Sequence, residues 1–170
     1  NTNFDFELMA DSYSYNNDYS VEEGNAVAEL MYSCGVSVNM NYNSSGTGSS
    51  SASSAYVDNA FIDYFGYEES SYNSRYNYND TEWIALLKND LNQLRPIYYA
   101  GKNDISGSGH AFVCDGYDEF DMFHFNWGWG GNNDGYFYVN NLDPNPGSLE
   151  YQSIHRIVNN VYPTGLEGCD

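Results

Sequence analysis

The chain has 170 residues, enough for one compact domain, and its 24 Asp and Glu against 5 Lys and Arg give a net charge of −19. Nucleic acids and anionic membranes bind basic surfaces, so neither is expected as a partner. Disordered acidic chains are poor in aromatic residues, whereas this chain has 18 Tyr, 9 Phe and 3 Trp and is therefore expected to fold.

The N-terminal part of the chain carries a helical pattern. Ser20 and Glu23 are spaced as in a capping box, and Gly35 is placed to end the helix. Between them, apolar residues recur at helical spacing. These residues are Val27, Leu30, Met31 and Cys34. The alternation over residues 36–40 then predicts a half-buried strand, and the Ser- and Gly-rich residues 43–54 predict a surface loop.

The rest of the chain changes from helical to β patterns. A short helix is predicted over residues 57–64, and a longer one begins at the N-cap Asp80 and stops before Pro96. The longer helix has an apolar stripe of Ile84, Leu87, Leu91 and Leu94. Strands are predicted over residues 97–99, 110–117, 122–127, 135–140 and 154–162. Helices followed by antiparallel strands indicate an α+β domain.

The three cysteines lie far apart, as Cys34, Cys114 and Cys169, with no Cys-x-x-Cys pair. This sparse, odd count argues against a disulfide framework and against a zinc site, and we expect no metal and no cofactor. Cys34 and Cys114 are interpreted as small buried residues of regular elements. His124 and His155 are interpreted as structural, because no cluster of metal ligands surrounds either of them in the sequence.

His110 is the candidate catalytic residue. A single histidine is more often structural, but this one follows Gly109 at the mouth of a predicted core strand. Glycine there lets a substrate backbone approach closely, and the strand gives the imidazole a rigid mount. An imidazole titrates near neutrality, so it is able to take a proton from a thiol and return it to a leaving amine.

A second unusual stretch is Asn126-Trp127-Gly128-Trp129-Gly130-Gly131. Aromatic residues alternating with glycine are compatible with a turn that packs its indoles, or with a platform that stacks on sugars. An indole beside a carboxamide on a neighbouring strand is also able to fix the orientation of a catalytic histidine and to shield it from water.

These segments together resemble the streptopain family of secreted, papain-like bacterial cysteine endopeptidases. The similarity rests on the tryptophan-glycine stretch, on residues 109–113 (GHAFV) and on residues 134–137 (DGYF). It extends upstream through residues 29–40, 51–52 and 65–67 and covers most of residues 20–162. The resemblance implies the papain-like α+β fold, mainly its antiparallel, histidine-bearing half with packed helices.

The resemblance also implies roles for individual residues. His110 corresponds to the catalytic general base and acid, and Trp127 to the tryptophan that positions it. Asn126 is a second orienting group by analogy with the asparagine of papain-like triads. Ser51 and Gly109 match positions that contact the backbone of substrate or inhibitor. Ala100 departs from the glutamine that some members carry there, so no side-chain contribution to an oxyanion hole is expected from it.

The nucleophilic cysteine of the family precedes the first helix found here, at a helix N-terminus that lowers the thiol pKa. Cys114 does not replace it, since four residues along a strand separate it from His110 by roughly 13 Å. We therefore expect residues 1–162 to be the C-terminal part of a catalytic domain and residues 163–170 a tail or linker. Its partners would be the missing N-terminal part, a propeptide and a peptide or protein substrate, and the chain alone would be inactive.

Two other interpretations remain open. The chain is also compatible with a degenerate, inactive peptidase relative in which the cysteine segment is replaced. A non-catalytic secreted module that binds glycans or proteins through its Tyr-, Trp- and Asn-rich surface is the alternative from another class. Four acidic residues within 115–121 suggest calcium, but their spacing is not that of an EF-hand loop.

Overall fold

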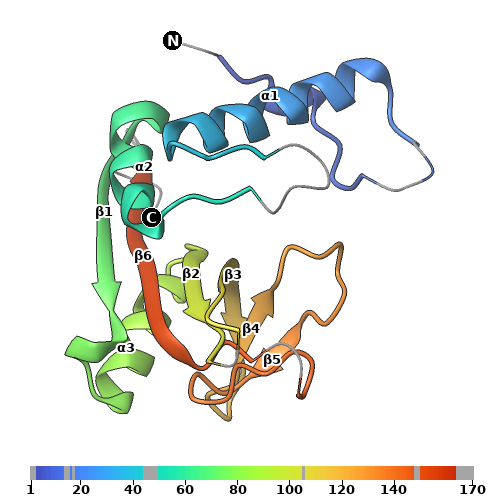
Figure 1. Cartoon of the computed structure of the whole chain (residues 1–170). Helices are drawn as coiled ribbons and strands as arrows, with labels where there is room; N and C mark the ends of the chain where they lie inside the picture. The colour runs from blue at the N-terminus through green and yellow to red at the C-terminus, as the bar shows by residue number, and fades with distance from the viewer. Residues whose placement is uncertain are drawn as a thin grey trace. The chain divides into compact units, whose positions relative to one another are not determined.

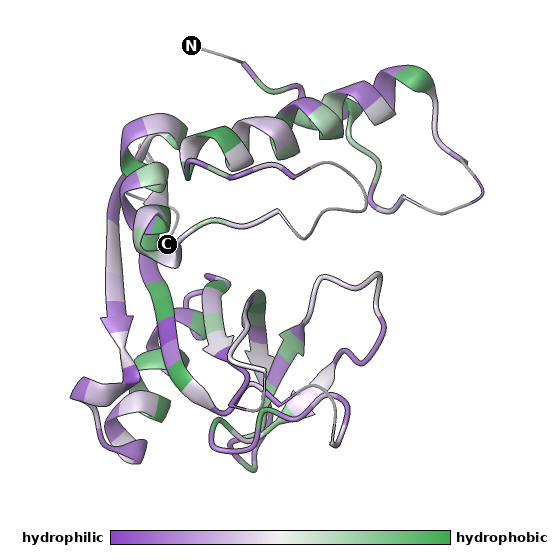
Figure 2. Cartoon of the chain, in the orientation of Figure 1, coloured by the Kyte–Doolittle hydropathy of each residue, from purple (hydrophilic) through white to green (hydrophobic). Residues whose placement is uncertain are grey.

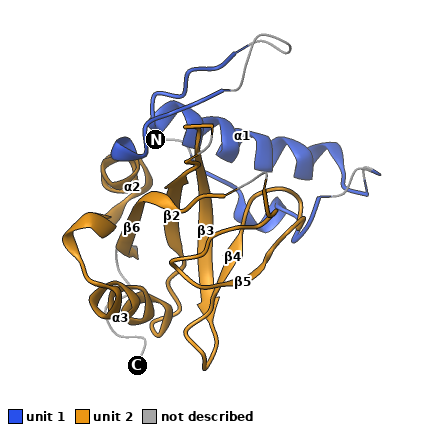
Figure 3. Ribbon diagram, turned by 60° about the horizontal axis from the view of Figure 1, so that its bottom comes forward, with its two compact units in different colours: residues 1–56 blue, residues 57–170 orange. Residues whose placement is uncertain are grey.

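The computed structural model describes residues 3–13, 16, 18–43, 50–104, 106–147 and 150–163. In chain order the elements are η1 (Phe6–Leu8), α1 (Val21–Ser37), η2 (Ser54–Tyr56), α2 (Val57–Phe65), β1 (Tyr67–Ser74), η3 (Arg75–Asn77), α3 (Asp80–Leu91), β2 (Ile97–Lys102), β3 (Gly109–Tyr117), β4 (Phe123–Asn126), β5 (Gly135–Phe137) and β6 (Ser153–Pro163) (Figure 1). Three α-helices and a six-stranded antiparallel sheet confirm the predicted α+β class. The chain divides into two compact units, residues 1–56 and 57–170 (Figure 3).

Helix α1 dominates the first unit. Its predicted capping box is confirmed: Ser20 Oγ accepts from the Glu23 N–H at 3.1 Å, and the Glu23 carboxylate accepts from the Ser20 N–H at 2.6 Å. The helix runs past Gly35 to Ser37, so the predicted end was wrong. Gly35 instead makes room for a neighbour, because a methyl group there would lie 1.9 Å from the Tyr42 hydroxyl.

The strand predicted over residues 36–40 was also wrong. Its first residues continue α1, and Asn39 adopts a left-handed conformation with φ of 52°. In the part of the first unit that the structure describes, the β pairing that follows is a single antiparallel bridge between Asn41 and Ser51. Cys34 is exposed in the structure, so the expectation of a buried thiol fails for this residue. Helix α1 mixes polar and apolar residues along its length (Figure 2), and no helix among the described residues is long and apolar enough to cross a membrane.

The second unit is built on the sheet, whose strand order is β1-β6-β2-β3-β4-β5. Strand β1 lies at one edge, over residues for which the sequence shows no clear period, and pairs antiparallel with β6. Helices α2 and α3 precede and follow β1 and lie at its two ends (Figure 1). The sheet therefore joins residues 67–74 to residues 153–163, far apart in the sequence.

Helix α3 covers one face of the sheet. Its N-cap is Asn79, one residue before the predicted Asp80, and Asn79 forms a capping box with Glu82. Leu87 of the predicted apolar stripe is fully buried, whereas Leu94 lies beyond the helix in a left-handed turn and is 91% exposed. The turn ends the helix before Pro96 and directs the chain into β2.

The core between α3 and the sheet is mostly aromatic. It includes Trp83 from α3 and, from the sheet and the segment after β4, Tyr99, Phe112, Phe125 and Trp127. The rings of Tyr99 and Phe112 stack with centroids 5.3 Å apart, and those of Phe112 and Trp127 lie 4.4 Å apart. Large rings fix their neighbours through many contacts, so this core is a rigid mount for the residues at its edge.

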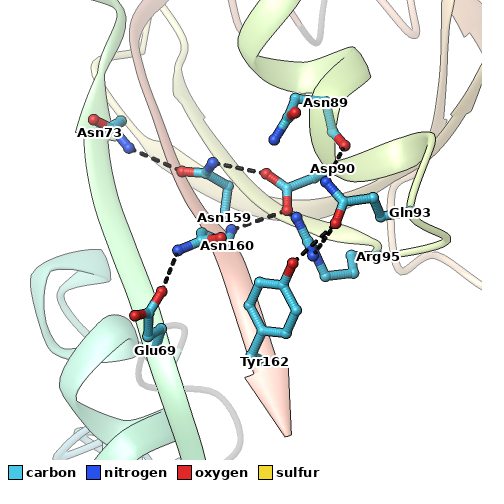
Figure 4. A network of polar contacts seen from close by, with 9 residues as sticks. All are labelled: Glu69, Asn73, Asn89, Asp90, Gln93, Arg95, Asn159, Asn160 and Tyr162. Atoms are coloured by element: carbon cyan, nitrogen blue, oxygen red, sulfur yellow. Dashed lines mark hydrogen bonds and ion pairs between the residues drawn. The ribbon is translucent and has the colours of Figure 1, made fainter. Parts of the chain in front are cut away.

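A buried polar network ties the end of α3 to β6 and β1 (Figure 4). Asp90 is fully buried; its carboxylate accepts from Arg95 Nε at 2.6 Å and from Asn159 Nδ2 at 2.8 Å. Asn159 in turn accepts from Asn73 Nδ2 at 2.8 Å. The guanidinium of Arg95 also lies over the ring of Tyr162, 4.1 Å from its centroid. The Asp90–Asn159 and Asn73–Asn159 bonds and the Arg95–Tyr162 contact cross between elements, so the network fixes where α3 lies on the sheet.

Replacing Arg95 with Met should destabilise the fold strongly, because the buried carboxylate of Asp90 loses its cation. We expect a loss of about 3 kcal/mol or more in the free energy of unfolding, measured by urea denaturation. Lys88→Met is the control, since Lys88 pairs with the half-exposed Asp121 and its loss should cost about 1 kcal/mol or less. Equal losses in the two variants would contradict the structural importance given to the Asp90 network.

Candidate active site

His110 lies near the start of β3, with Gly109 before it at the mouth of the strand. In the β2–β3 ladder His110 is opposite Gly101, and Gly109 is opposite Lys102. Gly109 is exposed, and the nearest atom to an added Cβ would be the Gly101 carbonyl oxygen at 3.8 Å. The backbone beside the imidazole is therefore exposed and uncrowded.

The imidazole of His110 is held through one nitrogen. Its Nε2 lies 2.8 Å from the backbone carbonyl oxygen of Trp127, in the segment that follows β4. A carbonyl only accepts hydrogen bonds, so this contact requires the proton of the neutral ring to be on Nε2. Nδ1 then carries a lone pair, and it has no hydrogen-bond partner among the described residues.

Aromatic rings surround the imidazole. The indole of Trp129 stacks on it with centroids 4.8 Å apart and planes 20° apart, and the ring of Tyr151 lies at 5.3 Å. Trp127 is fully buried, and its ring centroid lies 5.8 Å from that of Trp129 and 5.8 Å from that of Tyr151. The hydrogen bond from His110 to Trp127 is therefore flanked by apolar rings, which limit competition from water.

The segment from Trp127 to Asp134 folds back through glycines. Gly128, Gly130 and Gly131 have φ of 74°, 63° and 84°, and an added Cβ would meet nothing within 4 Å at any of them. Backbone conformation, not crowding, is therefore what favours glycine here. The carboxylate of Asp134 accepts from the Trp127 N–H at 2.9 Å. This bond fixes the backbone at Trp127, the residue whose carbonyl holds His110.

The structure places Asn126 differently from the sequence expectation. Its side-chain oxygen accepts from the Gly128 N–H at 2.9 Å, and no contact with His110 is found among the described residues. Side chains alternate along a strand, so Asn126 is exposed while its neighbours Phe125 and Trp127 are buried on the other face.

Ser51 belongs to the first unit, where its N–H and C=O pair with Asn41.

The other two histidines have structural surroundings, as predicted. His124 Nδ1 lies 2.5 Å from a carboxylate oxygen of Asp115 on the partly exposed side of the sheet. His155 is buried between Tyr99 and the backbone of Tyr151. Among the described residues no three His, Cys, Asp or Glu side chains are grouped to hold a metal ion.

Neither described thiol is suited to act as the nucleophile. Cys114 is fully buried in the core, and this burial, followed by the nearby Asp115 carboxylate, raises its pKa strongly. Desolvation also raises the pKa of Cys34. Thiolates are stabilised by the opposite kind of environment. Cys169 lies outside the described residues.

Four residues of this site were missed in the sequence analysis. Trp129 and Asp134 were noticed as parts of motifs, yet no role was given to them. Tyr151 and His155 are brought to the site only by the return of β6 through the sheet, and no local pattern marks them. Long-range packing of this kind is not visible in a single sequence.

The sequence matches the Peptidase C10 family over residues 1–137. The chain belongs to this family. It is 40% identical to streptopain of Streptococcus pyogenes over 140 residues, which are 78% of this chain and 34% of streptopain. It is 43% identical over 131 residues to the thiol protease/hemagglutinin PrtT of Porphyromonas gingivalis, covering 76% of this chain and 14% of that protein. The chain thus spans about a third of the length of the streptopain relatives.

Solved structures agree with the family. Active wild-type interpain A, a cysteine protease of Prevotella intermedia, is similar with a TM-score of 0.82 and 33% identity, over 95% of this chain and 65% of that one. A mutant fragment of prointerpain A from the same organism gives a TM-score of 0.75 and 34% identity, over 95% of this chain and 49% of that one. The predicted papain-like fold and the streptopain resemblance are both confirmed.

The buried His155 should make folding stability depend on pH. Burial lowers its pKa to about 4, the nearby Arg75 contributes to the lowering, and the hydrogen bond to Tyr151 and the charge of Asp104 oppose it. As pH falls below the ordinary histidine pKa of about 6.5, the unfolded chain takes up a proton first and stability declines until the folded form is protonated near pH 4.

We expect this group to remove about 3 kcal/mol from the free energy of unfolding between pH 6.5 and 4. Urea denaturation of the wild type and of His155→Gln over this range measures it, since the variant lacks the titrating group. Parallel pH dependences of the two proteins would contradict a neutral, buried His155.

Proposed function

We propose that this chain is the histidine-bearing part of a secreted cysteine endopeptidase, with His110 as its general base and acid. The observation that supports this most is the hydrogen bond from His110 Nε2 to the Trp127 carbonyl, which leaves the lone pair on Nδ1 without a described partner. A general base needs such an open nitrogen on a rigid mount. The relationship to streptopain and PrtT supports the same class of reaction.

The nucleophile in this proposal is a cysteine upstream of the chain. Cys114 points into the core with a strongly raised pKa, and Cys34 has a raised pKa as well. This chain covers 65% of interpain A. Such a longer relative therefore has further residues that are able to supply the nucleophilic cysteine. Without that segment the chain has a base and no nucleophile, and we expect it to be inactive alone.

The proposed reaction moves one proton between sulfur, His110 and the leaving amine. The thiol gives its proton to Nδ1, and the thiolate attacks the peptide carbonyl carbon to form a C–S bond. Collapse of the tetrahedral adduct breaks the C–N bond while Nδ1 returns the proton to the amine. Water then gives a proton to Nδ1, attacks the acyl carbon and releases the carboxylic acid and the thiolate, which recovers the proton. Nε2–H stays on the Trp127 carbonyl throughout.

Trp127 and Asn126 are proposed to act as positioning residues. Trp127 supplies the carbonyl that binds Nε2, and its indole anchors that peptide in the core. Asn126 acts on the same peptide group, because its side-chain oxygen accepts from the Gly128 N–H, which shares that group with the Trp127 carbonyl. Trp129 covers a face of the imidazole and is placed to stabilise the imidazolium that forms in each half-reaction.

The substrate is proposed to be an extended peptide of a protein. Gly109 and Ser51 are the proposed contacts to its backbone, Gly109 because it is exposed beside His110 and Ser51 by the family resemblance. A propeptide is proposed as a further partner, and the similarity to a prointerpain A fragment supports it. No cofactor takes part in this mechanism.

His110→Ala should abolish the proton transfer that activates the thiol. In the full-length protein, a thiol-directed peptide epoxide should label one upstream cysteine, and the rate of labelling should fall by at least about 100-fold in the variant. His124→Ala is the matched control, because this partly exposed histidine pairs with Asp115 elsewhere on the sheet and should keep the wild-type rate.

Unchanged labelling in His110→Ala would overturn the role given to His110. If the wild type itself were not labelled and cleaved no peptide, the chain would be a degenerate relative or a binding module, and the proposed peptidase function would be lost.

Trp129→Leu should weaken the thiolate–imidazolium pair, because a cation over an indole face gains about 1 kcal/mol at a partly exposed site. The rate of epoxide labelling at pH 6 should then fall about fivefold, with the same circular dichroism spectrum as the wild type. Trp129→Phe, which keeps an aromatic face, should recover most of the rate. Equal rates for Leu and Phe would contradict an electrostatic contribution from the ring.

A further inference from the structure

The proposed reaction gives no part to two buried residues, Tyr151, whose ring lies 5.3 Å from that of His110, and His155, which is hydrogen-bonded to the Tyr151 carbonyl. We propose that Tyr151, fixed by His155, is a positioning residue that holds the His110 ring in the orientation required for proton transfer. This inference rests on the proposed function. It adds a second support for the imidazole, independent of the Trp127 carbonyl.

A chain of hydrogen bonds with only one possible direction fixes His155. The Tyr151 carbonyl only accepts, so the neutral ring of His155 carries its proton on Nε2 and donates to that carbonyl at 2.8 Å. His155 Nδ1 then accepts from the Tyr99 hydroxyl at 3.0 Å, and that hydroxyl accepts from the indole Nε1 of Trp83 at 3.2 Å. Trp83, Tyr99 and His155 are all buried, so water does not compete for these bonds.

The backbone of Tyr151 is held on two further sides. Its N–H donates to the Leu142 carbonyl at 2.8 Å. It also lies directly over Gly101, where an added Cβ would be 2.9 Å from the Tyr151 oxygen and 3.0 Å from its Cβ. Gly101 is the residue opposite His110 in the β2–β3 ladder. The Tyr151 backbone thus packs on Gly101, the residue that pairs with His110 in the sheet.

From this fixed backbone, the Tyr151 ring reaches the imidazole. Its centroid lies 5.3 Å from that of His110 and 6.4 Å from that of Trp129, which itself stacks on His110 at 4.8 Å. The three rings are therefore in mutual contact. Trp129 restrains the imidazole from one side and Tyr151 from another, while the Trp127 carbonyl fixes Nε2.

Such restraint matters because proton transfer depends steeply on geometry. A displacement of about 1 Å at a reacting group can cost on the order of 100-fold in rate. A missing ring at position 151 leaves a space into which the imidazole is able to rotate, and that rotation would break the bond to the Trp127 carbonyl. The Tyr151 hydroxyl has no hydrogen-bond partner among the described residues, so we attribute the effect to the ring and not to the hydroxyl.

The test uses the full-length protein and two sets of variants. Tyr151→Leu removes the ring and Tyr151→Phe keeps it. Gly101→Ala displaces the Tyr151 backbone from a different strand, and His155→Phe removes both hydrogen bonds while it retains a ring. His124→Phe is the matched control on a partly exposed histidine that pairs with Asp115. Active sites are titrated with the peptide epoxide, so that kcat refers only to correctly folded molecules.

Tyr151→Leu, Gly101→Ala and His155→Phe should lower kcat per titrated site by about 10- to 100-fold with KM within about twofold. Tyr151→Phe and the control should stay within about twofold of the wild type, and His155→Gln should recover part of the loss seen in His155→Phe. A purely structural role would lower the number of titrated sites and leave kcat per site unchanged, and this result would overturn the proposal.

A second readout does not depend on peptidase activity. The Nε2–H signal of His110 in proton NMR should exchange slowly with water in the wild type and in Tyr151→Phe, and quickly in Tyr151→Leu. Slow exchange in Tyr151→Leu would overturn the positioning role even if the protein cleaved no peptide. Loss of peptidase activity in the wild type, with this exchange pattern retained, would instead reject only the proposed function.

Discussion

The site depends on the hydrogen bond between His110 Nε2 and the carbonyl oxygen of Trp127, 2.8 Å long. Because a carbonyl is only an acceptor, this one contact selects the tautomer of the ring and leaves the Nδ1 lone pair for chemistry. A side-chain amide would be free to turn, whereas this acceptor belongs to the backbone next to a fully buried indole. The orientation of the imidazole is thus set by the core of the domain.

The surrounding structure can be understood as the means of holding these two groups in place. Strand β3 carries His110, and the Gly-rich segment after β4 brings the Trp127 carbonyl to it, with Asp134 bonded to the N–H of the same residue. Further away, the buried Asp90 network fixes α3 on the sheet, and α3 supplies the Trp83 indole that begins the hydrogen-bond chain to His155. Stability and the geometry of the site are therefore coupled.

The sequence was sufficient to predict the α+β class, the capped first helix and the papain-like family, because these depend on local patterns and a specific combination of motifs. It misjudged residues 36–40, where alternation of apolar residues suggested a strand although the helix continues and Asn39 turns the chain. It missed β1, whose polar residues show no period and are recruited by pairing with β6. At β1, tertiary pairing with β6 overrode local preference.

For the site, motifs were enough to single out His110 and Trp127 but not the atoms through which they interact. The amide of Asn126 was expected near the imidazole, yet strand alternation places it on the other face and the backbone of Trp127 takes that position. Tyr151 and His155 come from a distant segment with no motif, so only the folded structure brings them to His110.

The most direct test of this account is the tautomeric state of His110 in the full-length protein. Histidine labelled with carbon-13 and nitrogen-15 reports it through the ring chemical shifts, and His110→Gln assigns the signal. We expect the neutral ring to carry its proton on Nε2, with an unprotonated Nδ1. A neutral His110 with its proton on Nδ1 would contradict the account, because the Trp127 carbonyl would then have no donor and no open nitrogen would face a thiol.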